Sequence, residues 1–150
     1  MFARKHIETK LGWMTIETTN EAVTKISFGK TGIEIGLCPI ADQASQEIVE
    51  YMAGERTQFS VKMAPRGTDF QKKVWDALKK IPYGVFPSYS DIAAAIGKPT
   101  ATRAVGMANN KNPIPIMIPC HRVIGRNGDL TGYAGGIPLK KKLLDLELRS

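Results

Sequence analysis

The sequence has few of the residues that build disulfide scaffolds or zinc sites. Its 150 residues include two cysteines, Cys38 and Cys120, and two histidines, His6 and His121. Two cysteines allow at most one disulfide, which excludes a secreted disulfide-rich scaffold, and free thiols suit a reducing compartment better. A four-ligand zinc site needs clustered cysteine and histidine. We therefore expect no bound metal.

Long apolar segments are also missing. No apolar run approaches the roughly 20 residues that a membrane-spanning helix requires. The first residues, MFARKHIETK, lack the apolar core of a signal peptide. An apolar fraction of 43% is still enough for a packed core. We expect a folded cytoplasmic protein, or a nuclear one if the source is eukaryotic, that makes no contact with membranes.

Positive charge is concentrated in the second part of the chain. Residues 1–64 hold 7 Lys or Arg and 8 Asp or Glu, whereas residues 65–150 hold 14 and 6. The net charges are therefore −1 and +8. This asymmetry favours a polyanionic partner for the second part. A solvated basic face is the alternative that charge alone leaves open.

The first part, residues 1–64, is predicted to be a small α+β domain. Four short segments have strand-like patterns, and the first two flank Asn20-Glu21, which fits a hairpin turn. Apolar residues at helical spacing predict one helix over residues 41–55, with Gly54 as its stop. The predicted strands are residues 12–19, 22–28, 32–37 and 57–63.

The second part, residues 65–150, follows a predicted linker at residues 64–68 and begins as a helix. Thr68 can cap this helix, which ends at Pro82. Apolar residues recur along one side of it, and we expect Trp75 in the core because it continues that stripe. The stripe consists of Phe70, Val74, Trp75, Leu78 and Ile81.

Two short helices around a glycine-containing turn predict a helix-turn-helix. Ser90 is the expected N-cap of the first, Gly97 and Pro99 terminate it, and the second ends near Asn109. The second helix reads ATRAVGMA, with Arg103 as its one long polar side chain, whereas major-groove recognition helices carry several. If it binds DNA, we expect shape and backbone contacts in the minor groove. A helix hairpin packed in the core is the alternative.

The end of the chain predicts a hairpin and a last helix. Asn127-Gly128 is a strong hairpin signal, and a hairpin after a helix-turn-helix is the wing of a winged helix. Pro138 fits the first turn of the last helix. The leucines of this helix form its apolar side, and we expect the three lysines at residues 140–142 to be largely solvated.

Cys120 is followed by His121 and preceded by prolines that alternate with aliphatic residues over 113–119. Proline biases the residue before it toward extended geometry, so we expect a stiff apolar arm that holds the thiol in place. A thiol in apolar surroundings has a raised pKa and is inert. A histidine oriented by a carboxylate would instead make it a nucleophile.

The residues around Cys120 leave its role open. A small core residue, a metal ligand, a redox switch and a nucleophile are all compatible with the local sequence. The candidate carboxylate partners of His121 are Asp129, Asp145 and Glu147, and spacing alone does not choose among them.

The stretch NPIPIMIPCHRVIGRNGDLTGYAGG, with IPYGVFPSYSDIA and RAVGMANNKNP before it and LLDLE after it, resembles one protein family. It is similar to the active-site region of the O6-alkylguanine-DNA alkyltransferases, also called methylated-DNA–protein-cysteine methyltransferases. The resemblance covers residues 66–150, and the earlier residues are similar only in layout. It implies an α+β fold: a small ribonuclease-H-like N-terminal domain followed by a helical winged-helix domain.

The resemblance also implies roles around the thiol. Cys120 would accept the alkyl group, His121 would deprotonate it through a water, and Glu147 would orient His121. Asn112 would brace the turn that holds this network. Tyr89 would help to rotate the phosphate and would donate a proton to the leaving guanine at N3.

Contacts with DNA and with the flipped base are implied in the same way. Arg103 would fill the gap that the flipped base leaves. Residues Ala104, Gly106 and Arg122 are expected beside it on the DNA-binding surface. Residues Tyr133, Val123, Ala134 and Gly135 are expected to frame the base pocket. Many members have serine where this chain has Ala134, but the family contact to guanine O6 uses the backbone N–H, which alanine keeps.

The implied activity is DNA repair by stoichiometric alkyl transfer. The substrate would be O6-alkylguanine, and also O4-alkylthymine, in double-stranded DNA, with base flipping from the minor-groove side and no cofactor. We expect a monomer. The alternatives are a non-catalytic sensor of alkylated DNA, a DNA-binding regulator with a structural cysteine, and a cysteine hydrolase that uses Cys120, His121 and Glu147. The sensor branch lacks the acceptor cysteine, and the basic second part argues against the hydrolase.

Overall fold

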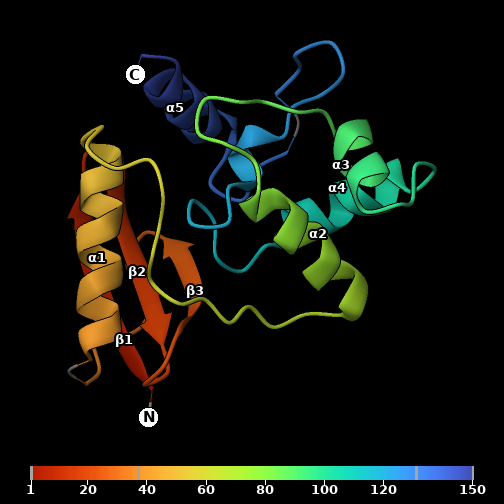
Figure 1. The fold of residues 1–150 in the computed structure, drawn as a ribbon. Coiled ribbons are helices and arrows are strands. Elements are labelled where there is room, and N and C mark those ends of the chain that lie inside the picture. Colours follow the sequence, from red (N-terminus) through yellow and green to blue (C-terminus); the bar gives the residue numbers. More distant parts are fainter. Residues whose placement is uncertain (1, 37, 131, 150) are drawn as a thin grey trace. The chain divides into compact units, whose positions relative to one another are not determined.

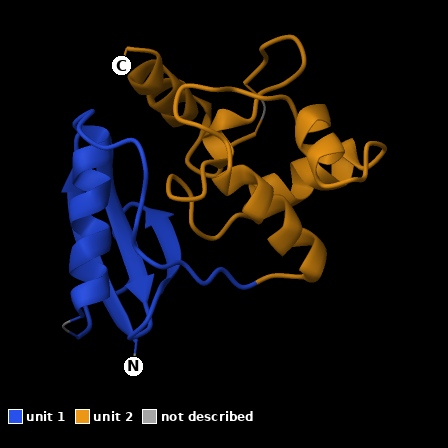
Figure 2. Ribbon diagram, viewed as in Figure 1, with its two compact units in different colours: residues 1–66 blue, residues 67–150 orange. Residues whose placement is uncertain are grey.

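A computed structural model describes residues 2–36, 38–130 and 132–149. The chain divides into two compact units, Met1–Arg66 and Gly67–Ser150 (Figure 2). The predicted boundary after residue 64 lies two residues before this division. Each unit has its own set of buried side chains.

The first unit is an antiparallel sheet with one helix packed along it (Figure 1). The strands β1 (Ala3–Thr9), β2 (Gly12–Thr18) and β3 (Val23–Phe28) lie in the order β1-β2-β3. Helix α1 (Pro39–Met52) packs on this sheet and buries Ala44, Ile48 and Tyr51. The predicted helix and the hairpin between the second and third strands are both confirmed.

Two predicted strands of the first unit do not form. Among the described residues, 32–36 make a single bridge, between Arg4 and Ile35, and the segment at 57–63 makes one between Val23 and Met63. Gly32 and Gly36 have positive φ angles that interrupt extended backbone. Strand β1 was not predicted, because it buries only two apolar side chains, Ala3 and Ile7, and so has a weak apolar pattern.

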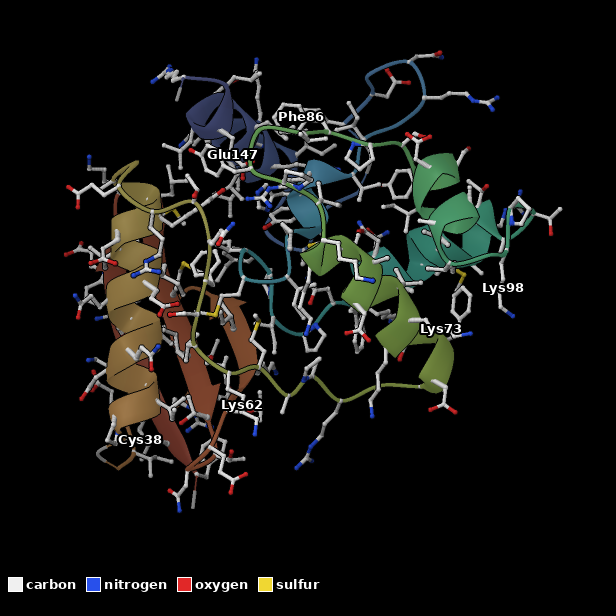
Figure 3. The ribbon with its side chains drawn as sticks, viewed as in Figure 1. Cys38, Lys62, Lys73, Phe86, Lys98 and Glu147 are labelled. Carbon is white, nitrogen blue, oxygen red and sulfur yellow. The ribbon has the colours of Figure 1, made fainter. Side chains whose placement is uncertain are left out.

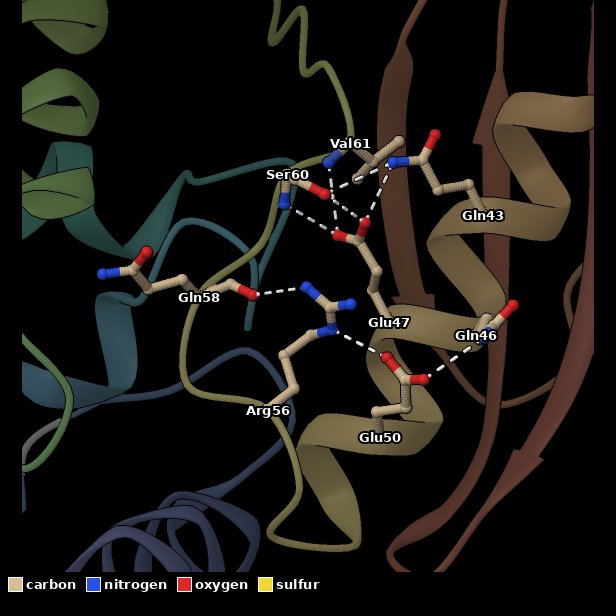
Figure 4. Close-up of polar contacts among 8 residues, drawn as sticks. All are labelled: Gln43, Gln46, Glu47, Glu50, Arg56, Gln58, Ser60 and Val61. Carbon is tan, nitrogen blue, oxygen red and sulfur yellow. Dashed lines mark hydrogen bonds and ion pairs between the residues drawn. The ribbon is translucent and has the colours of Figure 1, made fainter.

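Glu47 on α1 explains why the segment after the helix is not a strand (Figure 4). Its carboxylate accepts hydrogen bonds from the backbone N–H groups of Ser60 at 2.9 Å and Val61 at 3.2 Å. The Ser60 hydroxyl at 2.7 Å and the Gln43 amide at 2.9 Å complete the cluster. A side chain thus satisfies backbone donors that a strand ladder would otherwise have paired.

The second unit starts with α2 (Asp69–Lys79), which Thr68 caps as predicted. Thr68 and Gln71 form a reciprocal capping box that satisfies two N–H groups at the start of the helix. Trp75 is 1% exposed and donates from Nε1 to the carbonyl of Ala108 at 2.9 Å. The expectation that Trp75 belongs to the core is confirmed, and its indole N–H also links α2 to the helix that contains Ala108.

Helices α3 (Tyr89–Ala95) and α4 (Thr102–Asn110) form the predicted pair around a turn with Gly97. The N-cap of α3 is Ser88, not Ser90, because Ser88 and Asp91 form the capping box. Of the three successive alanines, only Ala93 is buried. A close approach of the two helices at this point therefore depends on one alanine.

The predicted wing is a loop over its described residues. Gly128 has φ +82° and donates to the carbonyl of Gly125, and Gly125 donates to that of Asp129, so the expected turn is present. Residues 124–130 add one bridge, between Ser88 and Ile124, and no strand ladder. The last helix, α5 (Ile137–Leu148), carries Pro138 in its first turn as predicted.

Candidate nucleophilic site

The segment before Cys120 is a tight turn and not the extended arm that its prolines predicted. Ile118 donates its N–H to the carbonyl of Ile114 at 3.0 Å, and Met117 donates to that of Pro115 at 2.9 Å. Ile116 has φ +74°, a region that β-branched residues seldom adopt. Such a residue costs on the order of 1–3 kcal/mol and persists only where its surroundings hold it.

Asn112 is part of the surroundings that stabilise this strained turn. Its Nδ2 donates to the carbonyl of Ile118 at 2.8 Å, and its Oδ1 accepts from the N–H of Ile114 at 2.9 Å. The side chain thus spans the turn from both ends while being 8% exposed. The position agrees with the bracing role expected for Asn112.

Cys120 begins the short 3₁₀ helix η1 (Cys120–Arg122) and is 4% exposed. Burial raises the pKa of its thiol to about 11, and a hydrogen bond with Asn112 and the charge of Lys140 oppose this rise only in part. The resting group is therefore the thiol, and attack by sulfur requires a base that takes its proton.

His121, the next residue of η1, is fully buried and held by a carboxylate. Its Nε2 lies 2.7 Å from Oε2 of Glu147. Glu147 belongs to helix α5 (Figure 3). Burial lowers the pKa of His121 below its ordinary value, although Glu147 opposes this effect. A neutral imidazole next to an anionic carboxylate can take up a proton and then be stabilised as imidazolium. Of the three candidate carboxylates, Glu147 is the one that contacts His121.

Gly84 and Arg122 also fix the orientation of Glu147. Gly84 donates its backbone N–H to Oε1 at 2.9 Å. Arg122 donates from Nε to both carboxylate oxygens, at 2.9 and 3.1 Å, and from Nη1 to the carbonyl of Ile81 at 2.7 Å. The carboxylate is therefore held by donors from two places in the second unit, the loop at Gly84 and the helix η1.

Arg122 does not lie where the sequence analysis expected it. It is 5% exposed, and its guanidinium is engaged with Glu147, the Ile81 carbonyl and the face of Tyr83. A buried guanidinium with these partners has little surface left for a phosphate. The expected place of Arg122 on the DNA-binding surface does not fit this burial, and its contacts make it a partner of Glu147 instead.

Lys140 is a site residue that the sequence analysis missed. It was expected in solvent, but it is fully buried and donates from Nζ to the carbonyl of Val123 at 2.7 Å. Burial lowers the pKa of Lys140, and the negative charge that Cys120 can carry raises it. A signal was available in the spacing, because Lys140 shares one helix face with Leu143, Leu144 and Glu147.

The exposed face of α4 adjoins a hollow of about 330 Å³. Tyr89 and Arg103 line it, and a methyl group on the α-carbon of Gly106 would lie in ordinary van der Waals contact with the Tyr89 ring, at 3.8 Å. Ala104 is exposed on the same helix. Met107, which the sequence analysis did not single out, also lines the hollow. The remaining residues around it are Thr102, Asn110 and Gly132.

The predicted pocket residues lie in two places along the chain. Val123 follows η1, is fully buried and accepts from Lys140 through its carbonyl. Tyr133 and Gly135 are partly buried and Ala134 is exposed, in a turn closed by a hydrogen bond from Gly136 to the Tyr133 carbonyl at 2.9 Å. These placements leave the expected pocket roles as predictions.

Neither a metal cluster nor a membrane helix is found in the part of the chain that the structure describes. No three His, Cys, Asp or Glu side chains there are grouped as metal ligands. None of the helices within 2–36, 38–130 and 132–149 has the length and apolar character needed to cross a bilayer.

The second unit matches the model of a known protein family. The model of the 6-O-methylguanine DNA methyltransferase DNA-binding domain matches residues 69–149. The methylated-DNA–protein-cysteine methyltransferase of Methanosarcina acetivorans is 48% identical over 147 residues, which cover 93% of this chain and 94% of the relative. The constitutive enzyme of that name from Bacillus subtilis is 45% identical over 151 residues, with coverage of 93% and 92%.

Solved structures agree with this relationship. The crystal structure of the O6-methylguanine methyltransferase of Mycobacterium tuberculosis has a TM-score of 0.90 and 42% identity, covering 99% of this chain and 94% of that one. The structure of the M. tuberculosis OGT in complex with DNA has a TM-score of 0.88 and 44% identity, with coverage of 97% and 92%. Both likenesses extend over the two units of the chain.

Proposed function

The chain belongs to the methylated-DNA–protein-cysteine methyltransferases, and from this membership we propose that Cys120 accepts the alkyl group of O6-alkylguanine in duplex DNA. The observation that carries the proposal is the buried Cys120 thiol, held by a braced turn next to the His121–Glu147 pair. O4-alkylthymine is the second substrate we propose.

Activation of Cys120 requires its proton to leave. With a pKa of about 11, only on the order of one thiol in ten thousand is ionised at pH 7. We propose that His121 takes the proton through a water and that Glu147 stabilises the resulting imidazolium. The buried ammonium of Lys140 favours the thiolate at the same moment.

The transfer step then balances without a cofactor. The Cys120 sulfur forms a bond to the alkyl carbon while the bond between that carbon and guanine O6 breaks. The electron pair of the broken bond stays on the guanine, and Tyr89 donates a proton at N3 to neutralise it. The thioether has no easy route back to a thiol, so each molecule acts once.

A base stacked in a duplex hides its O6 substituent, so the lesion has to leave the helix at a cost of roughly a few kcal/mol. We propose that α4 enters the minor groove, with Arg103 in the gap that the base leaves. Ala104 and Gly106 carry little or no side chain and allow close approach to the DNA backbone. The flipped base would be framed by Tyr133, Val123, Ala134 and Gly135.

We also propose that the second unit is a winged-helix frame in which a loop replaces the wing, that the first unit is ribonuclease-H-like, and that the protein works as a monomer. Helices α3 and α4 around a glycine turn support the first part of this proposal.

The test of single use is a titration. A fixed amount of protein is mixed with increasing amounts of duplex that contains O6-methylguanine, and restored guanine is counted. We expect the count to stop at one guanine per protein molecule. Continued turnover would contradict the proposal, and no restoration would overturn the assigned activity.

A further inference from the structure

Met107 is a large apolar side chain that the proposed reaction leaves unused. It lies on the exposed face of α4 with Arg103, Ala104 and Asn110, while Val105 and Ala108 form the buried face. Met107 is 64% exposed. It is therefore not needed to fill the core of the second unit.

Met107 lies between two hollows on the surface of the second unit. The first, of about 330 Å³, also involves Tyr89 and Arg103. The second, of about 250 Å³, involves Phe70, Ala104 and other residues of α2 and α4. Because Met107 lines both, its side chain is a large apolar group on a helix face whose other exposed residues, Arg103, Ala104 and Asn110, are small or polar.

The distance along the helix relates this ridge to Arg103. Four residues of α-helix rise about 6 Å, which is less than two base-pair steps of about 3.4 Å. If Arg103 fills the gap of the flipped base, Met107 faces the nucleotides beside that gap. Methionine is flexible and apolar, and apolar side chains of this kind pack into minor grooves without reading sequence.

We propose that Met107 is a further DNA-contacting residue, which packs its thioether side chain against the minor-groove edge of the nucleotides next to the flipped base. This inference rests on the proposed function. It adds a sequence-independent contact that stabilises the opened duplex and has no part in the chemistry at Cys120. A contact of this kind fits lesions that occur in any sequence.

The test compares Met107→Ala with Met107→Leu. Alanine is the strongest helix former, so α4 is kept while the apolar contact is lost, and leucine keeps apolar volume. Ile33→Ala is the matched control, because Ile33 is also a highly exposed aliphatic side chain, at 74%, but belongs to the first unit. Transfer rates are measured with O6-methylguanine duplex and with free O6-benzylguanine, and thermal unfolding is followed for each variant.

We expect Met107→Ala to slow transfer from the duplex by about fivefold to tenfold, which corresponds to the loss of one to two buried methylene-sized contacts. Transfer from free O6-benzylguanine needs no DNA contact, so its rate in Met107→Ala should stay within about twofold of the rate of the unchanged protein. Met107→Leu and Ile33→Ala should keep both rates.

Equal rates for Met107→Ala and the unchanged protein on the duplex would overturn the inference and leave the proposed function standing. Equal slowing on duplex and free base would overturn it too, because the effect would then lie in the pocket or the fold. Failure of the unchanged protein to act on the duplex would overturn both proposals.

Discussion

Each unit of this protein contains a buried glutamate that collects hydrogen bonds, and the two glutamates do different work. Glu47, 3% exposed, accepts from neutral groups: two backbone N–H groups, the Ser60 hydroxyl and the Gln43 amide. Glu147, 2% exposed, accepts from Arg122, from the backbone of Gly84 and from His121.

The comparison shows that burial and hydrogen bonding do not by themselves mark a reactive carboxylate. The neutral donors of Glu47 fix a segment of backbone to a helix. Glu147 differs in contacting His121, a titratable ring that follows Cys120 in the chain. Its negative charge can therefore stabilise His121 when the ring takes up a proton. The guanidinium of Arg122 pairs with the Glu147 carboxylate and favours its negative charge, and that charge would also stabilise a positively charged His121.

Glu147→Gln is the change with the largest expected effect. The amide keeps the size of the side chain but removes the charge that stabilises a protonated His121, so we expect transfer to slow by about 10²-fold or more. Stopped-flow or quench measurements with O6-methylguanine duplex check this. Glu47→Gln is the matched control, and an equal loss of rate in that variant would contradict the division of roles.

Arg103→Ala separates DNA opening from chemistry. We expect transfer from duplex DNA to slow by about tenfold to a hundredfold, because the flipped state loses its gap filler, while transfer from free O6-benzylguanine changes little. Rates measured in parallel on both substrates show whether Arg103 acts in opening the duplex or in the chemical step. A similar loss on both would count against insertion of Arg103 into the duplex.

Lys140→Met tests the buried ammonium of the reactive unit. Methionine keeps the length of the stem but removes the positive charge, which raises the pKa of Cys120 further. We expect alkyl transfer from free O6-benzylguanine to slow by about tenfold, and the pH profile of this rate to move toward higher pH. Lys141→Met, at an exposed position of the same helix, is the control. An unshifted profile in Lys140→Met would refute the electrostatic role.

Glu47→Gln should affect stability alone. Burial by itself would raise the pKa of Glu47, but its hydrogen bonds outweigh burial and hold the pKa below 4.5. Its stabilising contribution is therefore present above pH 4.5 and is lost as the pH falls through the lower value in the folded state. At pH 7 we expect the first unit to lose about 1–3 kcal/mol in denaturant unfolding. If the difference in the free energy of unfolding between Glu47→Gln and the unchanged protein stayed constant down to acid pH, this explanation would be contradicted.

The sequence predicted those features that depend on local spacing. Thr68 and Trp75 were placed by capping and by an apolar stripe, and both lie as expected. Ile116 was not predicted in its turn, because the hydrogen bonds of Asn112 override the extended preference that proline imposes on its neighbours. Local sequence preference is a weak guide to backbone conformation where a buried side chain supplies the hydrogen-bond partners of the backbone.

The site itself was only partly readable from the sequence. The choice of Glu147 over Asp129 and Asp145 came from the family resemblance, and the fold supports it through contact with His121. Lys140 and Arg122 were misplaced because charged residues are seldom buried unless paired. Helical spacing places Lys140 on the apolar face of its helix, but it does not supply the partners: the Val123 carbonyl for Lys140 and the Glu147 carboxylate for Arg122 are tertiary contacts.

The most direct test asks which thiol carries the alkyl group after repair. Cys38 has a lowered pKa, chiefly through a hydrogen bond from the Thr18 hydroxyl, whereas the pKa of Cys120 is raised. If acidity alone decided reactivity, Cys38 would be modified. After incubation with O6-methylguanine duplex, peptide mass spectrometry should find one methyl group, on Cys120. A methyl group on Cys38, or repaired DNA with Cys120 unmodified, would contradict the account.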